Sequence, residues 1–218
     1  FAEIKNNILP KDYHKIDFKN LNIYLIEGSK NTLNNMSESS KIESNRYLTS
    51  MGVIIINETF VKDYDGETLI LSNNTNIISK TVIWTAGVIG NKIEGLSNDK
   101  ITVGNRIKVD RINKIVESNN IFAIGDIAYM TTPKYPKGHP QVANVAINQA
   151  KLLSKNLKNI VLNKSTSEYE YKDLGSMATI GKHKAVVDLP YLHFKGYFAW
   201  LIWMFLHLML VLSVKNKL

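Results

Sequence analysis

The sequence contains no cysteine among its 218 residues. Disulfides, thiolate metal sites and dithiol redox chemistry are therefore excluded from this stretch of chain. Its histidines are scattered without the spacing of metal ligands, so the sequence predicts no metal site. The hydrophobic fraction of 44% is ordinary for a globular protein, and it is enough for a sizeable core in one large domain or two small ones.

Arginine is absent from residues 131–218, and acidic residues are scarce there. This segment holds twelve lysines and four acidic residues, whereas residues 1–130 hold fifteen basic and fifteen acidic side chains. The whole net charge of +8 therefore lies at the C-terminal end. Such an end suits an anionic membrane surface, an anionic ligand or nucleic acid. Nucleic acid is the weaker alternative, because no basic run is interleaved with stacking aromatics.

Glycine is absent from residues 1–20. Residues 21–26 predict a strand that ends in Glu27 and Gly28. A carboxylate at the tip of the second strand of a Rossmann unit receives the ribose hydroxyls of NAD, and a glycine-rich phosphate loop lies about 20 residues before it. Here that loop would have to precede Phe1. Glu27 is therefore either a nucleotide ligand or a solvated strand-end carboxylate, and we expect the chain to be a fragment of a longer protein.

The next elements follow the order strand, helix, strand, hairpin. Residues 36–50 predict a polar helix capped by Ser37 or Ser39, and residues 52–56 predict a strand. Residues 61–71 predict a hairpin, in which Asp-Gly at 65–66 favours a type I′ turn. This order is typical of the second half of a nucleotide-binding domain.

Two apolar segments are predicted to end as strands beside a ligand. Residues 81–87 finish in Ala86 and Gly87, whose small size would let a flat ring or a pyrophosphate approach the backbone; tight packing is the alternative. Residues 121–124 predict a short buried strand, followed by Gly125 and Asp126. In a parallel α/β sheet ligands bind at the carboxyl ends of strands, where the Asp126 oxygens would accept hydrogen bonds from hydroxyls. An ordinary Gly-Asp turn is the alternative.

A helix is predicted from about residue 141 to 162, with Pro140 as its first residue. Asn144 and Asn148 share one face of it at i, i+4. The helix N-terminus carries partial positive charge, and pointed at a flavin it would stabilise the negative charge of the reduced ring. An amphipathic surface helix with its amides in water is the alternative.

The C-terminal part predicts strands over residues 169–171 and 174–188, with Gly175 and Gly181 as turns and a basic turn at 182–184. Residues 197–214 are apolar nearly all round and would form a helix of borderline spanning length. A spanning helix, an interfacial helix and a buried core helix remain open. Flanking lysines and the aromatics of its first half favour membrane contact.

Together these stretches resemble the type II NADH:quinone oxidoreductases, flavoproteins of the two-dinucleotide-binding-domain superfamily. The resemblance rests on residues 23–27 (IYLIE), 83–88 (IWTAGV), 121–126 (IFAIGD), 136–149 (PKGHPQVANVAINQ) and 174–182 (LGSMATIGK), in the family's order. It implies an α/β fold, with incomplete FAD- and NAD-binding Rossmann-like domains followed by an α+β membrane-associating region. The implied ranges are 1–78 for the NAD-binding domain, 79–162 for the FAD-binding domain and 163–218 for the membrane-associating region.

The resemblance also implies site residues. FAD would be bound by Asp126 through its ribityl chain and approached by Gly125, Ala86, Gly87, Ala143 and Asn144, while Glu27 would hold the adenosine ribose of NADH. The quinone would meet Asn144, Asn148, Gln149 and Lys182. The family's segment is Ala-Gln-x-Ala-x-Gln-Gln, and two of its glutamines are replaced here by Asn144 and Asn148, whose amides reach one methylene less.

The implied activity passes hydride from NADH to FAD and electrons on to a quinone, without proton pumping. The implied setting is peripheral, at the cytoplasmic face of a bacterial inner membrane, with membrane lipid as a partner, no nucleic acid and a homodimer left open. The isolated chain is expected to be inactive. The rivals are a sulfide:quinone or disulfide reductase, which would need cysteines, and a non-catalytic membrane-surface module.

Overall fold

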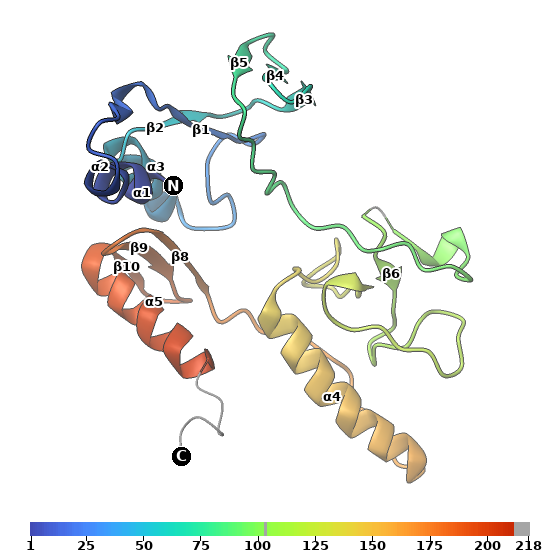
Figure 1. Ribbon diagram of the computed structural model, residues 1–218. Coiled ribbons are helices and arrows are strands. Elements are labelled where there is room, and N and C mark those ends of the chain that lie inside the picture. The colour runs from blue at the N-terminus through green and yellow to red at the C-terminus, as the bar shows by residue number, and fades with distance from the viewer. Residues whose placement is uncertain (103, 212–218) are drawn as a thin grey trace. The chain divides into compact units, whose positions relative to one another are not determined.

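The computed structural model describes residues 1–102 and 104–211. The chain forms two compact units, one from residues 1–83 together with the C-terminal residues from 173 onward, the other from residues 84–172 (Figure 1). Both units combine helices and strands, and the α/β fold class predicted from the sequence is confirmed.

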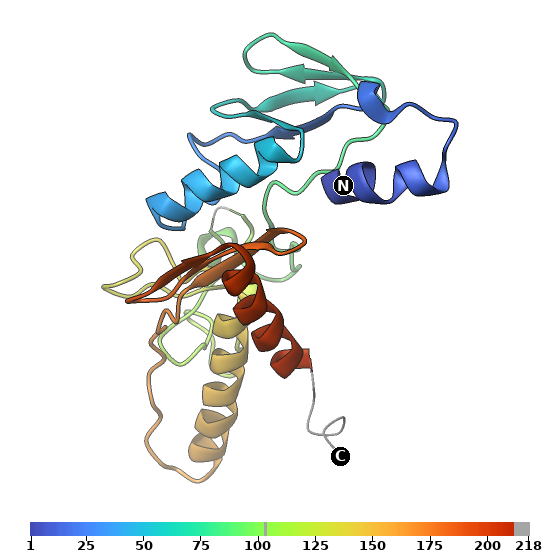
Figure 2. The same ribbon diagram turned by 90° about the vertical axis from the view of Figure 1, so that its left-hand side faces the viewer.

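The first unit begins with three short helices, α1 (Ala2–Asn7), α2 (Leu9–Asp12) and η1 (Phe18–Asn20), followed by strand β1 (Ile23–Ile26). The chain continues through helix α3 (Glu38–Ser50) into strand β2 (Val53–Ile56), which pairs with β1 in parallel. Figure 2 shows α3 lying against these strands. The Ser37 hydroxyl caps α3 by accepting a hydrogen bond from the Ser40 amide. The predicted strand, helix and strand are confirmed.

An antiparallel meander of β3 (Val61–Tyr64), β4 (Thr68–Leu71) and β5 (Asn76–Ile78) follows. Its buried Leu69, Leu71 and Ile77 pack on Ile26 and Ile56, the last residues of the parallel pair. The predicted hairpin is confirmed, but the predicted type I′ conformation of its turn was wrong. That turn needs positive φ at both central residues, and here Gly66 has a φ of +102° while Asp65 does not. The Asp65 carboxylate instead accepts hydrogen bonds from the amides of Glu67 and Thr68.

The C-terminal part of this unit is the antiparallel sheet β8 (Ser176–Gly181), β9 (Lys184–Asp188) and β10 (His193–Lys195), covered by helix α5 (Gly196–Val211). Ala199 and Trp200 face the sheet, where they pack against Ala185 and Val187. The predicted apolar helix is confirmed as far as Val211, and residues 212–218 lie outside the described residues. Over the part of the chain that is described, helices long and apolar enough to cross a bilayer are absent.

Asp188 ties this sheet to the start of α3. Its carboxylate accepts hydrogen bonds from the Ser37 amide (2.6 Å), the Ser37 hydroxyl (2.9 Å) and the Ser40 hydroxyl (2.8 Å), and His193 Nδ1 lies 2.9 Å away. Burial works against ionisation of Asp188, but these hydrogen bonds outweigh it and lower the pKa of the carboxyl below its ordinary value.

Replacing Asp188 with alanine is expected to destabilise the protein by about 1–3 kcal/mol at neutral pH, because the Ser37 amide and the Ser40 hydroxyl lose their acceptor. A lowered folded-state pKa means that this stabilisation is present above the unfolded pKa of about 3.9 and is lost as the pH falls through the folded-state value. The thermal midpoints of the wild type and of Asp188→Ala, measured from neutral to strongly acid pH, should converge as the pH falls. A difference between the two thermal midpoints that stays constant with pH would contradict this prediction, and Asp12→Ala, at an exposed aspartate of the same unit, serves as control.

The second unit has little regular structure before its long helix. Strand β6 (Ile107–Lys108) pairs in parallel with β7 (Ala128–Tyr129), η2 (Asn98–Lys100) and η3 (Gly125–Ile127) are single helical turns, and α4 (Ala143–Val161) is the main helix. The core lies between these strands and the first turns of α4, and its buried residues are Ile107, Val109, Ile115, Ala123, Ala128, Met130, Val145, Tyr169 and Tyr171.

Three strand predictions in this region were wrong. Residues 121–124 make only an isolated bridge, from Phe122 to Lys114, and Ile121 is exposed. Residues 81–87 and 169–171 are irregular. A strand forms only where a neighbouring strand pairs with its backbone, and an apolar pattern does not predict whether such a neighbour is present.

The start of the long helix also differs from its prediction. The helix begins at Ala143, and Val142 caps it in an extended conformation. The carbonyl of Pro140 accepts a hydrogen bond from the Val142 amide in a tight turn. Pro140 therefore belongs to the loop before the helix instead of its first turn.

Candidate functional site

The Gly125–Asp126 turn leads from the core of the second unit to its surface. Gly125 has a φ of +72°, and a Cβ added to it would stand 3.3 Å from the Cβ of Ala146, so the position favours glycine. Its amide donates a 2.7 Å hydrogen bond to Oε1 of Gln149, a side chain only 1% exposed. Asp126 is exposed, and its carboxylate accepts no hydrogen bond from the described residues. The turn thus presents an unpaired carboxylate on a firmly held backbone.

Arg106, directly before β6, holds the same turn. Its Nε donates to the carbonyl of Asp126 (3.1 Å), and one of its terminal nitrogens donates to the carbonyls of Ala128 (2.7 Å) and His139 (3.0 Å). The guanidinium also lies over the Tyr129 ring, 5.3 Å from its centroid. Sequence analysis missed Arg106, because a single arginine among short strands belongs to no motif. Its role depends on three carbonyls that are remote in sequence.

The first turn of α4 lies next to the Gly125–Asp126 turn. Ala146 and Gln149 both contact Gly125, and Gln141, just before the helix, donates to the Asp126 carbonyl (3.2 Å). The helix has no side-chain cap, and within the described residues the amides of Ala143 and Asn144 have no acceptor, whereas the Val145 amide donates to the Val142 carbonyl (3.0 Å). Asn148 donates to Asn144 Oδ1 (2.8 Å), and both side chains are partly exposed. The helix therefore offers amide groups and partial positive charge beside Asp126.

The remaining predicted FAD and quinone residues lie in less regular places. Ala86 and Gly87 are exposed in irregular chain, and Gly87 has a φ of +96°. Lys182 is exposed in the turn between β8 and β9, where its amide donates to Glu3 Oε1 (2.9 Å). Lys182 belongs to the first unit and Asn144 to the second.

Glu27 follows β1 at the carboxyl end of the parallel pair. Its amide donates to the Ile56 carbonyl (2.9 Å), and its carboxylate Oε1 accepts from the Ser29 amide (2.8 Å). This is the edge of a parallel α/β sheet at which ligands bind. The carboxylate is half-buried, with one oxygen engaged by its own loop.

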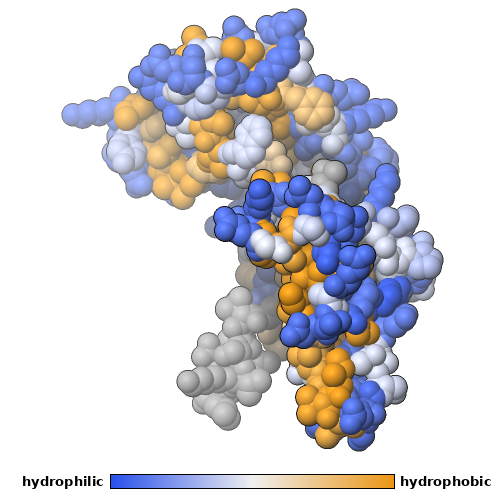
Figure 3. Space-filling view, turned by 90° about the vertical axis from the view of Figure 1, so that its right-hand side faces the viewer, coloured by the Kyte–Doolittle hydropathy of each residue, from blue (hydrophilic) through white to orange (hydrophobic). Residues whose placement is uncertain are grey.

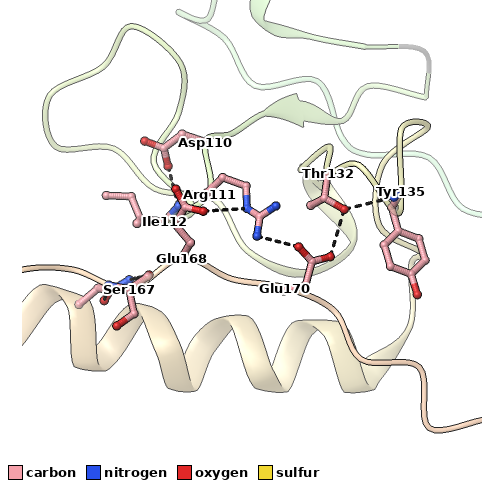
Figure 4. Close-up of polar contacts among 9 residues, drawn as sticks. Asp110, Arg111, Ile112, Thr132, Tyr135, Ser167, Glu168 and Glu170 are labelled. Atoms are coloured by element: carbon pink, nitrogen blue, oxygen red, sulfur yellow. Dashed lines mark hydrogen bonds and ion pairs between the residues drawn. The ribbon is translucent and has the colours of Figure 1, made fainter.

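Three loops of the second unit are joined by Arg111 (Figure 4). Its terminal nitrogen contacts Glu170 Oε2 (2.8 Å), and its Nε lies 3.9 Å from Glu168 Oε2. The other Glu170 oxygen accepts from the Thr132 hydroxyl (3.2 Å). Partial burial opposes ionisation of Glu170, but the hydrogen bonds from Arg111 and Thr132 outweigh it and lower the pKa. This network fixes the loop that leads into α4.

His139 stands in the same loop, buried among tyrosine rings. It is 1% exposed, its ring contacts Tyr135 and Tyr169 edge-on at centroid distances of 5.2 and 5.3 Å, and neither ring nitrogen has a hydrogen-bond partner within the described residues. Burial lowers the pKa of His139, and the positive charge of Arg111 and Arg106 adds to this effect, while Glu170 opposes it. His139 is therefore neutral in the folded protein near neutral pH.

A buried neutral histidine makes stability fall in mild acid. The unfolded chain takes up a proton on His139 below about pH 6.5, whereas the folded chain does so only at lower pH, so the free energy of unfolding decreases as the pH falls below that value. His139→Phe is expected to flatten the dependence of the thermal midpoint on pH between about pH 6.5 and 5. His14→Gln, at an exposed histidine, should leave the dependence unchanged. Equal curves for the wild type and His139→Phe would contradict the prediction.

Two protein families match this chain. Residues 13–150 match the family described as pyridine nucleotide-disulphide oxidoreductase, and residues 174–218 match the NDH2 C-terminal domain. The chain therefore belongs to the pyridine nucleotide-disulphide oxidoreductase family. Within that family, its resemblance to the type II NADH:quinone oxidoreductases is confirmed by both matches and by the relatives described next.

Two curated relatives are type II NADH:quinone oxidoreductases. The chain is 29% identical to Ndh of Mycobacterium tuberculosis over 99% of its own length and 48% of the relative, and 30% identical to a Staphylococcus aureus enzyme over 78% of its own length and 43% of the relative. The chain thus spans about half the length of these relatives.

Two solved structures share the fold. The NDH2 of Plasmodium falciparum, in complex with NADH, has a TM-score of 0.87 at 22% identity, over 100% of this chain and 60% of that one. The sulfide:quinone oxidoreductase of Aquifex aeolicus has a TM-score of 0.65 at 16% identity, over 89% and 50%.

Proposed function

We propose that this chain is part of a longer flavoenzyme that oxidises NADH and reduces a quinone. The single observation that carries the proposal is the Gly125–Asp126 turn, an unpaired exposed carboxylate beside the N-terminus of α4, which has no side-chain cap. The family membership and the type II NADH:quinone oxidoreductase relatives support it. The share of the relatives that is covered, about half, supports the assignment to a longer protein.

The residues present fit FAD. Hydroxyls of the ribityl chain would donate to Asp126, Gly125 packs closely on Ala146 and so keeps the turn beside α4, and the first amides of α4 at Ala143 and Asn144 suit a negatively charged group. Arg106 and Gln149 hold the turn in place. Bound FAD would supply the hydride acceptor, while these residues bind and orient it.

NADH would be bound by Glu27 through its adenosine ribose hydroxyls. For the quinone we propose Asn144 and Asn148, whose partly exposed amides are linked by one hydrogen bond on α4. Gln149 is buried on Gly125, so its contribution would be to the shape of the flavin site. Lys182 is proposed as a further quinone residue, and Ala86 and Gly87 as further FAD residues. We propose that this electron transfer is not coupled to proton pumping.

We also propose peripheral attachment to the cytoplasmic face of a bacterial inner membrane through α5. Its face opposite the sheet exposes Tyr197, Phe198, Leu201, Phe205, Leu208 and Met209. An apolar helix face next to lysines binds an anionic lipid surface in its interfacial plane. Exposed apolar residues also gather near the C-terminal end of α4 at Leu157, Ile160, Val161 and Leu162, and Figure 3 shows apolar patches among hydrophilic side chains.

Rapid mixing tests the proposed reaction. The full-length protein should be yellow, should lose its flavin absorbance on mixing with NADH and should regain it on adding a soluble quinone. A colourless protein, or flavin that NADH does not bleach, would overturn the proposal. The 218-residue chain on its own is proposed to be inactive.

A sulfide:quinone oxidoreductase is the second candidate, supported by the fold of the Aquifex aeolicus structure. Sulfide oxidation by that class depends on cysteines, and this chain contains none. Reduction of the flavin by sulfide, with no effect of NADH, would favour this candidate.

A further inference from the structure

An exposed aromatic ring lies against Gly28, next to Glu27. Phe60 is 66% exposed, and the nearest atoms to a Cβ built on Gly28 all belong to its ring, with Cδ1 and Cζ at 2.9 Å. Any side chain at position 28 would displace the ring. Gly28 thus lets the Phe60 ring rest on the backbone directly after the carboxylate at the carboxyl end of β1.

The Phe60 backbone is held in place. Its amide donates to the Ser72 hydroxyl (2.9 Å), and its carbonyl accepts from the Ser72 amide (2.8 Å). The preceding residue, Thr59, is buried and donates its amide to the Glu27 carbonyl (3.1 Å). The loop after β2 is therefore bonded both to the meander and to the Glu27 loop, and the exposed ring stands on a rigid support.

A single exposed phenylalanine on a protein surface needs no functional explanation. Phe60 differs in three respects: its backbone is fixed, one part of its ring rests on a glycine, and it lies at the sheet edge where a nucleotide binds. A flat apolar surface of similar size would cover the exposed ring face most completely.

We propose that Phe60 is the platform on which the adenine base of NADH stacks, which makes it a residue that determines specificity for the adenosine half. The proposal rests on the function proposed above. In adenosine, the base is attached to the carbon next to the one that bears the 2′-hydroxyl. A ribose whose hydroxyls bind Glu27 therefore carries its base into the neighbourhood of Gly28 and Phe60. Stacking on an aromatic ring suits the base, since its flat faces need no hydrogen bonds.

The test compares NADH with reduced nicotinamide mononucleotide, which has the same reacting ring but no adenosine. In the full-length protein, Phe60→Ala is expected to raise KM for NADH about tenfold, since base stacking on an aromatic ring is worth about 1–3 kcal/mol and 1.4 kcal/mol is tenfold. KM for the mononucleotide should not change. The dissociation constant of ADP-ribose, measured by calorimetry, should rise by the same factor as KM for NADH. Phe60→Tyr, which keeps the ring, should behave as the wild type.

Ile78→Ala serves as matched control, because Ile78 is an exposed apolar residue of the same meander. Should Phe60→Ala fold poorly, Phe60→Leu keeps the apolar bulk and removes the flat ring, and the same selective loss is expected. Unchanged affinity for NADH and ADP-ribose in both variants, or an equal loss with the mononucleotide, would overturn the proposal. Failure of the proposed function looks different, since the wild type would then oxidise neither nucleotide.

Discussion

Replacing Asp126 with alanine is expected to give a full-length protein that folds but retains little flavin. The carboxylate accepts no hydrogen bond from the described residues, so its loss should cost little stability. The loss of affinity for FAD is expected to be large. A hydrogen bond to a charged group contributes about 1.5–3 kcal/mol, which corresponds to roughly 10–100-fold weaker binding. The measurement is the ratio of flavin to protein after purification, with the dissociation constant for added FAD.

Two further variants separate charge from position. Asp126→Asn keeps the shape and one acceptor oxygen, and it should bind FAD more weakly than the wild type but more tightly than Asp126→Ala. Glu94→Ala removes an exposed carboxylate of the same unit and should retain all its flavin. A full complement of flavin in Asp126→Ala would show that this turn does not hold the cofactor.

The second large effect is expected at α5. Phe198 and Phe205 lie seven residues apart on its exposed side, whereas Ala199 is fully buried against the sheet. Burying such a side chain is worth about 1.5–3 kcal/mol, so Phe198→Asp combined with Phe205→Asp should weaken binding to lipid vesicles at least ~100-fold. Flavin content should not change. Co-sedimentation with vesicles of mixed anionic and neutral phospholipids measures the effect.

Ile160→Asp combined with Val161→Asp is the matched control for α5, because these residues are also exposed and apolar but lie near the end of α4. This pair should leave vesicle binding within about twofold of the wild type, since lipid binding is assigned to the exposed face of α5. Unchanged binding of the α5 variant, or equal losses in both pairs, would contradict attachment through α5.

The sequence predicted those elements whose signals are local. Ser37 as the cap of α3, the alternation that defines β1 and the turn at Gly66 each depend on a few neighbouring residues, and each was found where expected. The type I′ conformation was the exception, because the Asp65 side chain bonds the next amides and replaces a second positive φ.

Predictions that needed a partner elsewhere in the chain failed. The apolar pattern of residues 121–124 indicated burial and a strand, but only Ala123 is buried and the backbone bonds to a loop at residues 113–115. Val142 takes the capping position of α4 because the Pro140 carbonyl closes a turn before the helix. Neither outcome follows from the periodicity of the residues involved.

The same difference between local signals and long-range contacts applies to the candidate site. Gly125 and Asp126 were recognisable, because a glycine and a carboxylate at the end of an apolar run carry their chemistry in the local sequence. Arg106 and Phe60 were not, because their roles come from contacts with residues far along the chain. Gln149 carried the family's pattern, yet only the structure shows that its oxygen accepts from Gly125.

The central claim is that NADH and a quinone exchange electrons through a flavin held at the Gly125–Asp126 turn. An anaerobic titration of the full-length protein with NADH, followed by its visible spectrum, tests it most directly. We predict that one equivalent of NADH per flavin removes the oxidised flavin band and that one equivalent of quinone restores it. A protein without that band, or a band that persists in excess NADH, would contradict the claim.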